Sequence, residues 1–458
     1  MKPDVKRKWS FAAAIFFLLL LLLPLARHWL ILYRPVAGVY YELTSFIVYL
    51  SDGVVVGVIL LAGWHAYLSP TPRPLLNRLS APILIPLALL TGLTLLSSTW
   101  AQDEGLALYV GLRLLWLFLL VIAVARLRPR PSLVAVGMGL TLFIQATVAL
   151  LQFSRQSDLN WQFLGEVPLD ILGLVSVIRV GTAQFIRGYG LTPHPNILGG
   201  LLVSLLLTLV AVFLDPNLSQ TQSVGEVKRT RRIGWLIIMG FGAGGLLVSF
   251  SRSAWLGGVI GGAFFLVILF LTPTWRRLYG RYIAIPVALA LILFTVFFAL
   301  RPNLFLARLM PSASYTETRS MDERARLAQL AGQIIMAQPV TGIGAGGFSP
   351  AIVAEVEKWD NVRPQPVHSV PLLISSELGL VGGLLWLWLM VAPVWGAWQS
   401  WRTGHLTLWG LGLTAGLLAL AVTDWFDYYS WGWAQGRLLR WILWGLWLNE
   451  VTNDATKI

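Results

Sequence analysis

Cysteine is absent from this chain of 458 residues, which excludes disulfide bonds, thiolate catalysis and cysteine-ligated metals. Charged residues are scarce as well: they make up 12% of the chain, whereas a typical soluble domain has about 25%. Hydrophobic residues make up 57% and are grouped in blocks of roughly 18 to 23 residues, the length needed to cross a bilayer. The composition therefore predicts a polytopic membrane protein embedded in a lipid bilayer.

Several well-known functional signatures are also missing. The chain contains no Walker-type loop, no dinucleotide fingerprint and no serine-hydrolase elbow. The net charge is +13, but the basic residues form short clusters between apolar blocks instead of one surface, which argues against nucleic acid as a partner. No second histidine or cysteine lies near His368 at metal-ligand spacing, so we expect no metal site. We also expect no cofactor.

We expect about twelve transmembrane helices in an all-α fold. The first apolar run follows Lys6-Arg7-Lys8 and has no small-x-small cleavage site, so it is predicted to be a retained helix with a cytoplasmic N-terminus. The expected spans lie near residues 1–27, 46–68, 80–99, 105–125, 132–153, 195–214, 233–250, 254–272, 283–300, 370–392, 406–424 and 433–449.

Lysine and arginine alternate between rich and poor loops, as the positive-inside rule requires. This alternation predicts that both termini are cytoplasmic and that 1–458 form one integral membrane domain. It also places two long segments outside the cytoplasm, 154–194 and 301–369, the second between the ninth and tenth spans. The loops predicted to be cytoplasmic contain Arg73 and Arg78; Arg126, Arg128 and Arg130; Lys228, Arg229, Arg231 and Arg232; Arg276, Arg277 and Arg281; and Arg402.

Glycines at helical spacing predict where helices approach closely. Gly257 and Gly261 form a small-xxx-small pair in the eighth span, and the next positions, Gly258 and Gly262, form another. The seventh span, 233–250, is also rich in glycine. We therefore expect the seventh and eighth spans to pack against each other.

Arg252 lies in a very short turn between two apolar blocks. An arginine at the membrane edge costs a few kcal/mol unless it is paired or faces a polar cavity. Its planar fork of donors suits a pair of phosphate oxygens. The alternative is an arginine that reaches the lipid headgroups. Arg187 lies in a loop, where an arginine is unremarkable, and is a second candidate for the same chemistry.

His368 opens the tenth span, after the long polar segment. A lone histidine can take a proton from a hydroxyl near neutral pH, although a capping or interfacial role is the alternative. His194 is flanked by two prolines and is expected to shape the loop that presents Asn196. The acidic residues after the eleventh span are interpreted as a structural ion-pair cluster with nearby arginines: Asp424 and Asp427 with Arg437 and Arg440.

Taken in order, these segments resemble the O-antigen ligase and O-antigen polymerase superfamily of bacterial envelope enzymes. Order, spacing and sidedness agree over roughly residues 180–392. The matching pieces are Pro195-Asn196, Ser251-Arg252-Ser253-Ala-Trp255-Leu256, Arg324 upstream of Gln338-Pro339-Val-Thr-Gly-Ile-Gly, and Val367-His368 followed by Glu377-Leu-Gly-Leu-Val-Gly.

The resemblance implies a fold similar to the C-type glycosyltransferases, with a large extracytoplasmic loop between helices 9 and 10. It also implies metal-independent transfer of a glycan from undecaprenyl pyrophosphate to an acceptor hydroxyl, on the outer side of the bacterial inner membrane. The implied site has His368 as the base, Arg187, Arg252 and Arg324 on the pyrophosphate, and His194, Asn196 and Ser369 in support. Family members usually have asparagine at the position of Ser369.

Two questions stay open at the level of the sequence. The acceptor could be a glycan, a lipid or a protein, corresponding to a polymerase, a ligase or a protein glycosyltransferase. The superfamily also includes a branch described as bicarbonate transporters, whose C-terminal end is similar to Thr423-Asp424-Trp-Phe-Asp427-Tyr in this chain. A transporter of small anions is therefore the alternative function.

Overall fold

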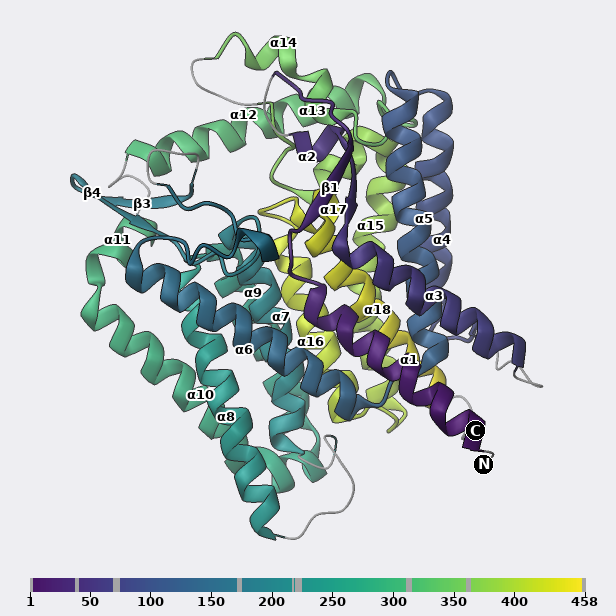
Figure 1. The fold of residues 1–458 in the computed structure, drawn as a ribbon, viewed down its shortest axis with the longest axis vertical. Helices are drawn as coiled ribbons and strands as arrows, with labels where there is room; N and C mark the ends of the chain where they lie inside the picture. The colour runs from purple at the N-terminus through teal and green to yellow at the C-terminus, as the bar shows by residue number, and fades with distance from the viewer. Residues whose placement is uncertain are drawn as a thin grey trace.

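The computed structural model describes residues 3–37, 41–68, 75–170, 175–215, 218, 225–309, 315–359 and 364–454. Arg73 lies outside the described residues, as do the side chains of Lys228 and Arg229. The described chain is mostly helical (Figure 1). Its helices are α1 (Pro3–Leu22), α2 (Tyr41–Thr44), α3 (Leu50–Leu68), α4 (Ala81–Leu96), α5 (Glu104–Leu127), α6 (Pro131–Arg155), α7 (Pro195–Leu214), α8 (Gly225–Val248), α9 (Arg252–Leu271), α10 (Pro273–Leu300), α11 (Pro302–Leu309), α12 (Tyr315–Ala337), α13 (Phe348–Ala351), α14 (Val353–Val356), α15 (Val370–Arg402), α16 (Leu408–Thr423), α17 (Tyr429–Gly432) and α18 (Ala434–Asp454), with 3-10 turns at Ser97–Thr99 and Gln162–Leu164.

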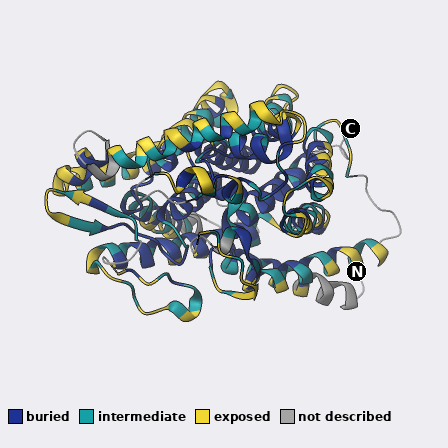
Figure 2. Cartoon of the chain, turned by 90° about the horizontal axis from the view of Figure 1, so that it is seen from above, coloured by how far each residue is buried: buried dark blue, intermediate teal, exposed yellow. Residues whose placement is uncertain are grey.

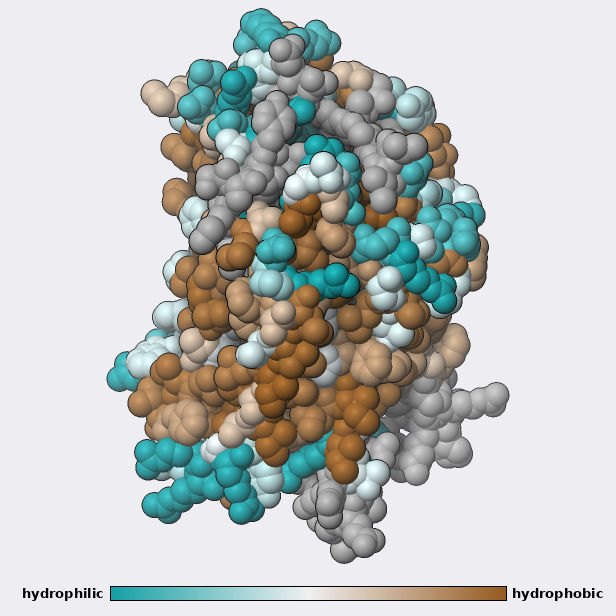
Figure 3. All heavy atoms as spheres, turned by 90° about the vertical axis from the view of Figure 1, so that its left-hand side faces the viewer, coloured by the Kyte–Doolittle hydropathy of each residue, from teal (hydrophilic) through white to brown (hydrophobic). Residues whose placement is uncertain are grey.

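Nine helices within these described ranges are long and apolar enough to cross a bilayer: α3 to α10 and α15. Shorter apolar helices cover Phe11–Leu22 in α1 and Leu408–Thr423, which is α16. The twelfth predicted span corresponds to α18, which contains two arginines. Each predicted span thus coincides with a helix, and the crossing of all twelve stays a prediction. Figure 3 shows hydrophobic residues across the middle of one face and hydrophilic residues at both ends.

Two short hairpins correct the prediction of a purely helical fold. Strand β1 (His28–Leu32) pairs antiparallel with β2 (Phe46–Tyr49), and β3 (Val177–Val180) pairs antiparallel with β4 (Ala183–Ile186). Aromatic and β-branched residues are frequent in these strands and favour extended backbone. The second predicted span accordingly begins as a strand and becomes helical only at Leu50.

The glycines of α9 face a different helix from the one predicted. A Cβ atom at Gly257 would lie 2.6 Å from the carbonyl oxygen of Ala419, and one at Gly261 would lie 2.7 Å from that of Ala415. Both carbonyls belong to α16, so the predicted packing of these glycines against the seventh span is wrong. Small residues mark a helix face that permits close approach, but they do not specify the partner.

The segment between α10 and α15 is folded and lies at the end of the molecule away from the two termini (Figure 1). It contains α11 to α14, and its longest helix, α12, runs across this end and packs against α15. Buried residues fill the centre of the molecule beneath it (Figure 2). Almost every side chain of α7 and α16 is buried there, so these two helices form the central pair on which the site is built.

Candidate functional site

The glycine-rich segment before α13 is bound to a break in α15. Gly379 has φ +71° and ψ 178°, which interrupts the helix. The N–H of Leu380 donates to the carbonyl of Pro339 (2.8 Å), and the N–H of Gly344 donates to the carbonyl of Glu377 (2.8 Å). Only glycine fits at position 379, because its positive φ disfavours side chains and a neighbouring backbone carbonyl occupies the space of a Cβ atom.

The side chain of Glu377 completes this attachment. Its carboxylate accepts hydrogen bonds from the backbone N–H groups of Gly346 and Phe348 and from the indole of Trp431, the last at 3.1 Å. The two motifs that stand apart in the sequence are therefore one structural unit. This unit fixes the C-terminal end of α12 against the first half of α15.

A cavity of about 380 Å³ lies where three arginines from three helices converge. Its apolar residues, Leu256, Met321 and Phe426, are exposed, so the cavity meets the surface of the molecule on its apolar side. In the described ranges, no three His, Cys, Asp or Glu side chains gather in a way that could hold a metal ion. The cavity is lined by Asn196, Arg252, Ser253, Leu256, Arg308, Met321, Arg324 and Phe426.

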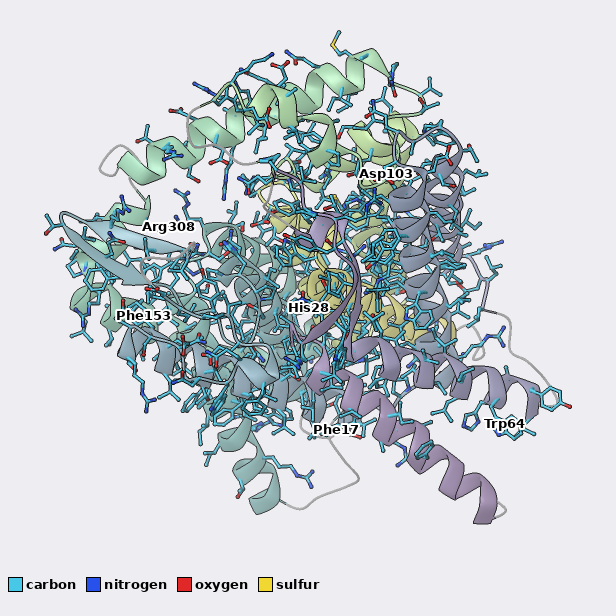
Figure 4. The ribbon with its side chains drawn as sticks, turned by 45° about the horizontal axis from the view of Figure 1, so that its top comes forward. Phe17, His28, Trp64, Asp103, Phe153 and Arg308 are labelled. Carbon is cyan, nitrogen blue, oxygen red and sulfur yellow. The ribbon has the colours of Figure 1, made fainter. Side chains whose placement is uncertain are left out.

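Arg252 is the first residue of α9 and lies on the wall of this cavity. The tight turn before it contains Phe250 with φ +47°. One guanidinium nitrogen of Arg252 donates to the carbonyl of Arg308 (3.0 Å). Figure 4 shows Arg308 beside the β3–β4 hairpin, against which α11 packs. Sequence reasoning did not identify Arg308, because it is one of several arginines in the same polar segment.

Arg187 lies behind the cavity wall and is 2% exposed. Its guanidinium donates to the carbonyl of Ser249 (2.7 Å), to Oγ of Ser176 (2.8 Å) and to Oδ1 of Asn196 (2.6 Å). The amide of Asn196 in turn donates to Oδ2 of Asp427 (2.7 Å). Arg187 is therefore connected to the cavity through Asn196.

His368 lies just before α15, is half-buried, and packs edge-on against the ring of Tyr428, with 5.2 Å between ring centroids. The N–H of Val370 donates to the carbonyl of Asp424 (2.8 Å), which ties the histidine to the turn after α16. Burial lowers the pKa of His368 well below its ordinary value, and the cation of Arg324 lowers it further. The imidazole is thus neutral near pH 7, and its Nδ1 has no hydrogen-bond partner in the described part of the chain.

His194 forms the N-cap of α7, and its Nδ1 accepts a hydrogen bond from the N–H of Asn196 (3.1 Å). Burial, followed by the Arg187 guanidinium, lowers the pKa of His194. This geometry agrees with the expected role of shaping the turn that presents Asn196. Ser369 is the N-cap residue of α15, and its buried Oγ has no hydrogen-bond partner among the described residues, so it does not hydrogen-bond to the imidazole of His368.

The two aspartates after α16 have different environments. Asp424 forms the predicted ion pair with Arg440 at 2.7 Å. Asp427 instead accepts from Asn196 and faces Arg324, and burial raises its pKa in spite of that cation. Its expected place in the same ion-pair cluster is therefore wrong. No local pattern signals the contact between Asn196 and Asp427, because 231 positions separate them.

One comparison with known proteins gives a match. A family model described as O-antigen ligase matches residues 236–387. The matched segment includes the three arginines of the cavity and His368, whereas Arg187, His194 and Asn196 precede it and Asp427 follows it. No curated protein matches the chain significantly. In the segment that carries the cavity arginines and His368, the chain is similar to the O-antigen ligase family.

Proposed function

We propose that the protein is a membrane glycosyltransferase of the O-antigen ligase type that acts in polysaccharide biosynthesis. It would move a glycan from undecaprenyl pyrophosphate to an acceptor hydroxyl on the outer side of the bacterial inner membrane, with both termini in the cytoplasm. The observation that supports this proposal most is the convergence of three arginines on one cavity, one of which, Arg324, also acts on the pKa of His368. The match to the O-antigen ligase model agrees with it.

The donor end of the reaction needs cations. As the glycosidic bond breaks, negative charge develops on the pyrophosphate, and guanidinium forks stabilise such charge through paired hydrogen bonds. Arg252 and Arg324 would bind the pyrophosphate, together with Arg308. Arg187 would act on the donor through Asn196. The exposed apolar residues at the cavity edge suit the prenyl chain, which stays in the lipid.

The acceptor end needs a base. The neutral imidazole of His368 would take the proton of the acceptor hydroxyl as its oxygen attacks the anomeric carbon. The new bond joins that carbon to the acceptor oxygen, and the old bond to the pyrophosphate oxygen breaks. Prenyl pyrophosphate leaves with the bonding electrons. In this proposal the arginines supply the positive charge, without a metal ion.

Thermal unfolding of the purified protein in nanodiscs tests the donor site. Undecaprenyl pyrophosphate should raise the melting temperature of the parent and should do so much less in Arg252→Lys. Inorganic pyrophosphate, which lacks the prenyl chain, should protect weakly. If bicarbonate or another small anion protects as well as the lipid does, the result favours the transporter and contradicts the glycosyltransferase.

A further inference from the structure

A second cavity, of about 350 Å³, adjoins the turn that carries His194 through Pro193. Three parts of the chain that are distant in sequence form its walls: the start of β1, the segment around the 3-10 turn Gln162–Leu164, and the start of α18. Figure 4 shows His28 near the middle of the molecule. The residues that line this cavity include Arg27, His28, Gln162, Pro193, Trp433 and Gln435.

The wall of this second cavity contains a buried hydrogen-bond acceptor without a donor. Gln435 is 3% exposed, and its Nε2 donates to the carbonyl of Leu25 (3.2 Å). This contact fixes the orientation of the amide, because two oxygens would otherwise face each other. The Oε1 atom has no hydrogen-bond partner among the described residues. Buried polar atoms are rarely left unsatisfied, so this oxygen is an acceptor in the cavity wall whose donor is not among the described residues.

The floor of the second cavity is preformed. Gly165 has φ +95°, and a Cβ atom there would lie 2.5 Å from the backbone nitrogen of Arg27. The carboxylate of Glu166 accepts from Nε2 of Gln152 (2.7 Å) and from the N–H of Trp161 (2.7 Å). This segment is thus held in place by its own contacts and needs no ligand to become ordered.

Two residues that line the second cavity are linked through the backbone to residues close to His368. Pro193, on one wall, precedes His194, whose pKa is lowered in part by His368. The backbone N–H of Trp433, on another wall, donates to the carbonyl of Tyr429. Tyr429 follows Tyr428, whose ring packs on His368. The turn before α7 thus contributes Pro193 to the second cavity and Asn196 to the cavity of the three arginines, the proposed donor cavity.

We propose that the second cavity binds a saccharide unit of the acceptor, an inference that rests on the proposed glycosyl transfer. The aromatic rings of Tyr49, His28 and Trp433 can pack on the apolar face of a pyranose ring. The amide of Gln162 can bond its hydroxyls as donor and acceptor, and Oε1 of Gln435 can act as an acceptor. The cavity is of the size that holds a small-molecule ligand, and a serine or threonine side chain would fill only a small part of it. The acceptor hydroxyl is thus assigned to a sugar instead of a protein.

Cysteine protection tests occupancy directly, because the parent chain has no cysteine. Gln162→Cys lines the second cavity, whereas Ser157→Cys lies in the same segment on the exposed surface. Millimolar hexoses and N-acetylhexosamines should slow labelling of Gln162→Cys by a charged thiol reagent and leave Ser157→Cys unchanged. Protection by a capped serine or threonine peptide in place of sugars, or protection by neither ligand, would overturn the proposal.

Kinetics separate this proposal from the proposed function. Trp433→Leu and Gln435→Met should each raise the acceptor KM by about tenfold. This is the loss of acceptor affinity expected when one or two hydrogen bonds or ring contacts are removed. Acceptor-independent hydrolysis of the donor should stay at the parental rate, and so should all activities of the control Trp161→Leu. Unchanged acceptor KM in both variants refutes the saccharide site. If undecaprenyl pyrophosphate does not raise the melting temperature of the parent protein, the result instead refutes the proposed glycosyltransferase function.

Discussion

Arginine side chains around the donor cavity have two different environments. The guanidinium of Arg187 is buried and donates to three acceptors within the chain, so it is held as part of the structure. Arg252 and Arg324 line the cavity, and Nε of Arg324 has no hydrogen-bond partner in the described part of the chain. A guanidinium has five N–H donors, so an arginine on the cavity wall can donate both within the chain and to an anion in the cavity.

Arg252→Lys tests the need for the arginine fork. Lysine keeps the charge but cannot make two parallel hydrogen bonds to a phosphate group. Hydrogen bonds to charged groups contribute about 1.5 to 3 kcal/mol, so we expect the transfer rate at low donor concentration to fall roughly tenfold to hundredfold. Expression and melting temperature should stay near parental values. Arg402→Lys, at the end of α15, is the matched control, and equal activity of the two variants would remove Arg252 from the site.

His368→Ala tests the base. Loss of general-base assistance should lower single-turnover transfer by about 10² to 10⁴, while affinity for the lipid-linked donor stays nearly unchanged. His194→Ala should have a smaller effect on the rate and should lose about 0.5 to 2 kcal/mol of stability, because it removes the N-cap of α7. Parental transfer by His368→Ala would exclude it as the base. A selective loss of donor binding would assign it to the pyrophosphate site.

The pH dependence of transfer follows from the lowered pKa of His368. The base acts when neutral, so the rate should be flat near pH 7 and should fall as the pH drops through this lowered value. In Arg324→Gln a repelling cation is lost, the pKa of His368 rises, and the acid limb should move toward neutral pH. Burial, the larger cause, remains, so the shift should be partial. The shift of the acid limb is measured by comparing pH–rate profiles of the parent and Arg324→Gln at saturating donor. A shift of the acid limb to lower pH in the variant would contradict this explanation.

At the level of elements, the two glycine pairs of α9 make a matched test of helix packing. A Cβ atom at Gly261 would lie 2.7 Å from the carbonyl oxygen of Ala415 in α16, whereas at Gly262 the nearest atom is a leucine methyl at 3.8 Å. Gly261→Ala should therefore destabilise the fold by about 1 to 3 kcal/mol, and Gly262→Ala should be neutral. Melting temperatures in detergent compare the two. Similar values would mean that α9 and α16 are not in close contact.

Sequence reasoning located elements better than it located contacts. Apolar length predicted helices at all twelve spans, because the cost of exposing backbone to lipid acts locally. It did not predict that α9 packs on α16 or that Asn196 meets Asp427, because these contacts join distant segments. The motif around Gly379 was recognised in the sequence, but the break in the helix was not predicted. The break is caused by the docking of the glycine-rich segment, which the order of residues does not show.

For the whole molecule, the sidedness of the cavities depends on the predicted topology. Single cysteines at Ser132 and Thr403 should resist an impermeant thiol reagent in intact cells, and those at Ser157 and Ala325 should react. Ala325 lies in α12 beside the donor cavity, and its side chain is exposed. Labelling of Thr403→Cys in intact cells, or protection of Ala325→Cys, would invert the proposed orientation and place the reaction in the cytoplasm.

The ion pair between Asp424 and Arg440 has a consequence for the biogenesis of the protein. Arg440 is buried in α18 between Trp386 and Trp444, with its guanidinium carbon 5.3 and 5.6 Å from their ring centroids. An unpaired arginine near the centre of an inserting helix costs roughly 2.5 to 3.5 kcal/mol on translocon scales. The helix α18 is thus expected to be a poor membrane segment by itself and to be stabilised by its packing on α5 and α16 and by the carboxylate of Asp424. Its integration is therefore expected to come late, after the earlier helices have left the translocon and brought the carboxylate of Asp424 into place.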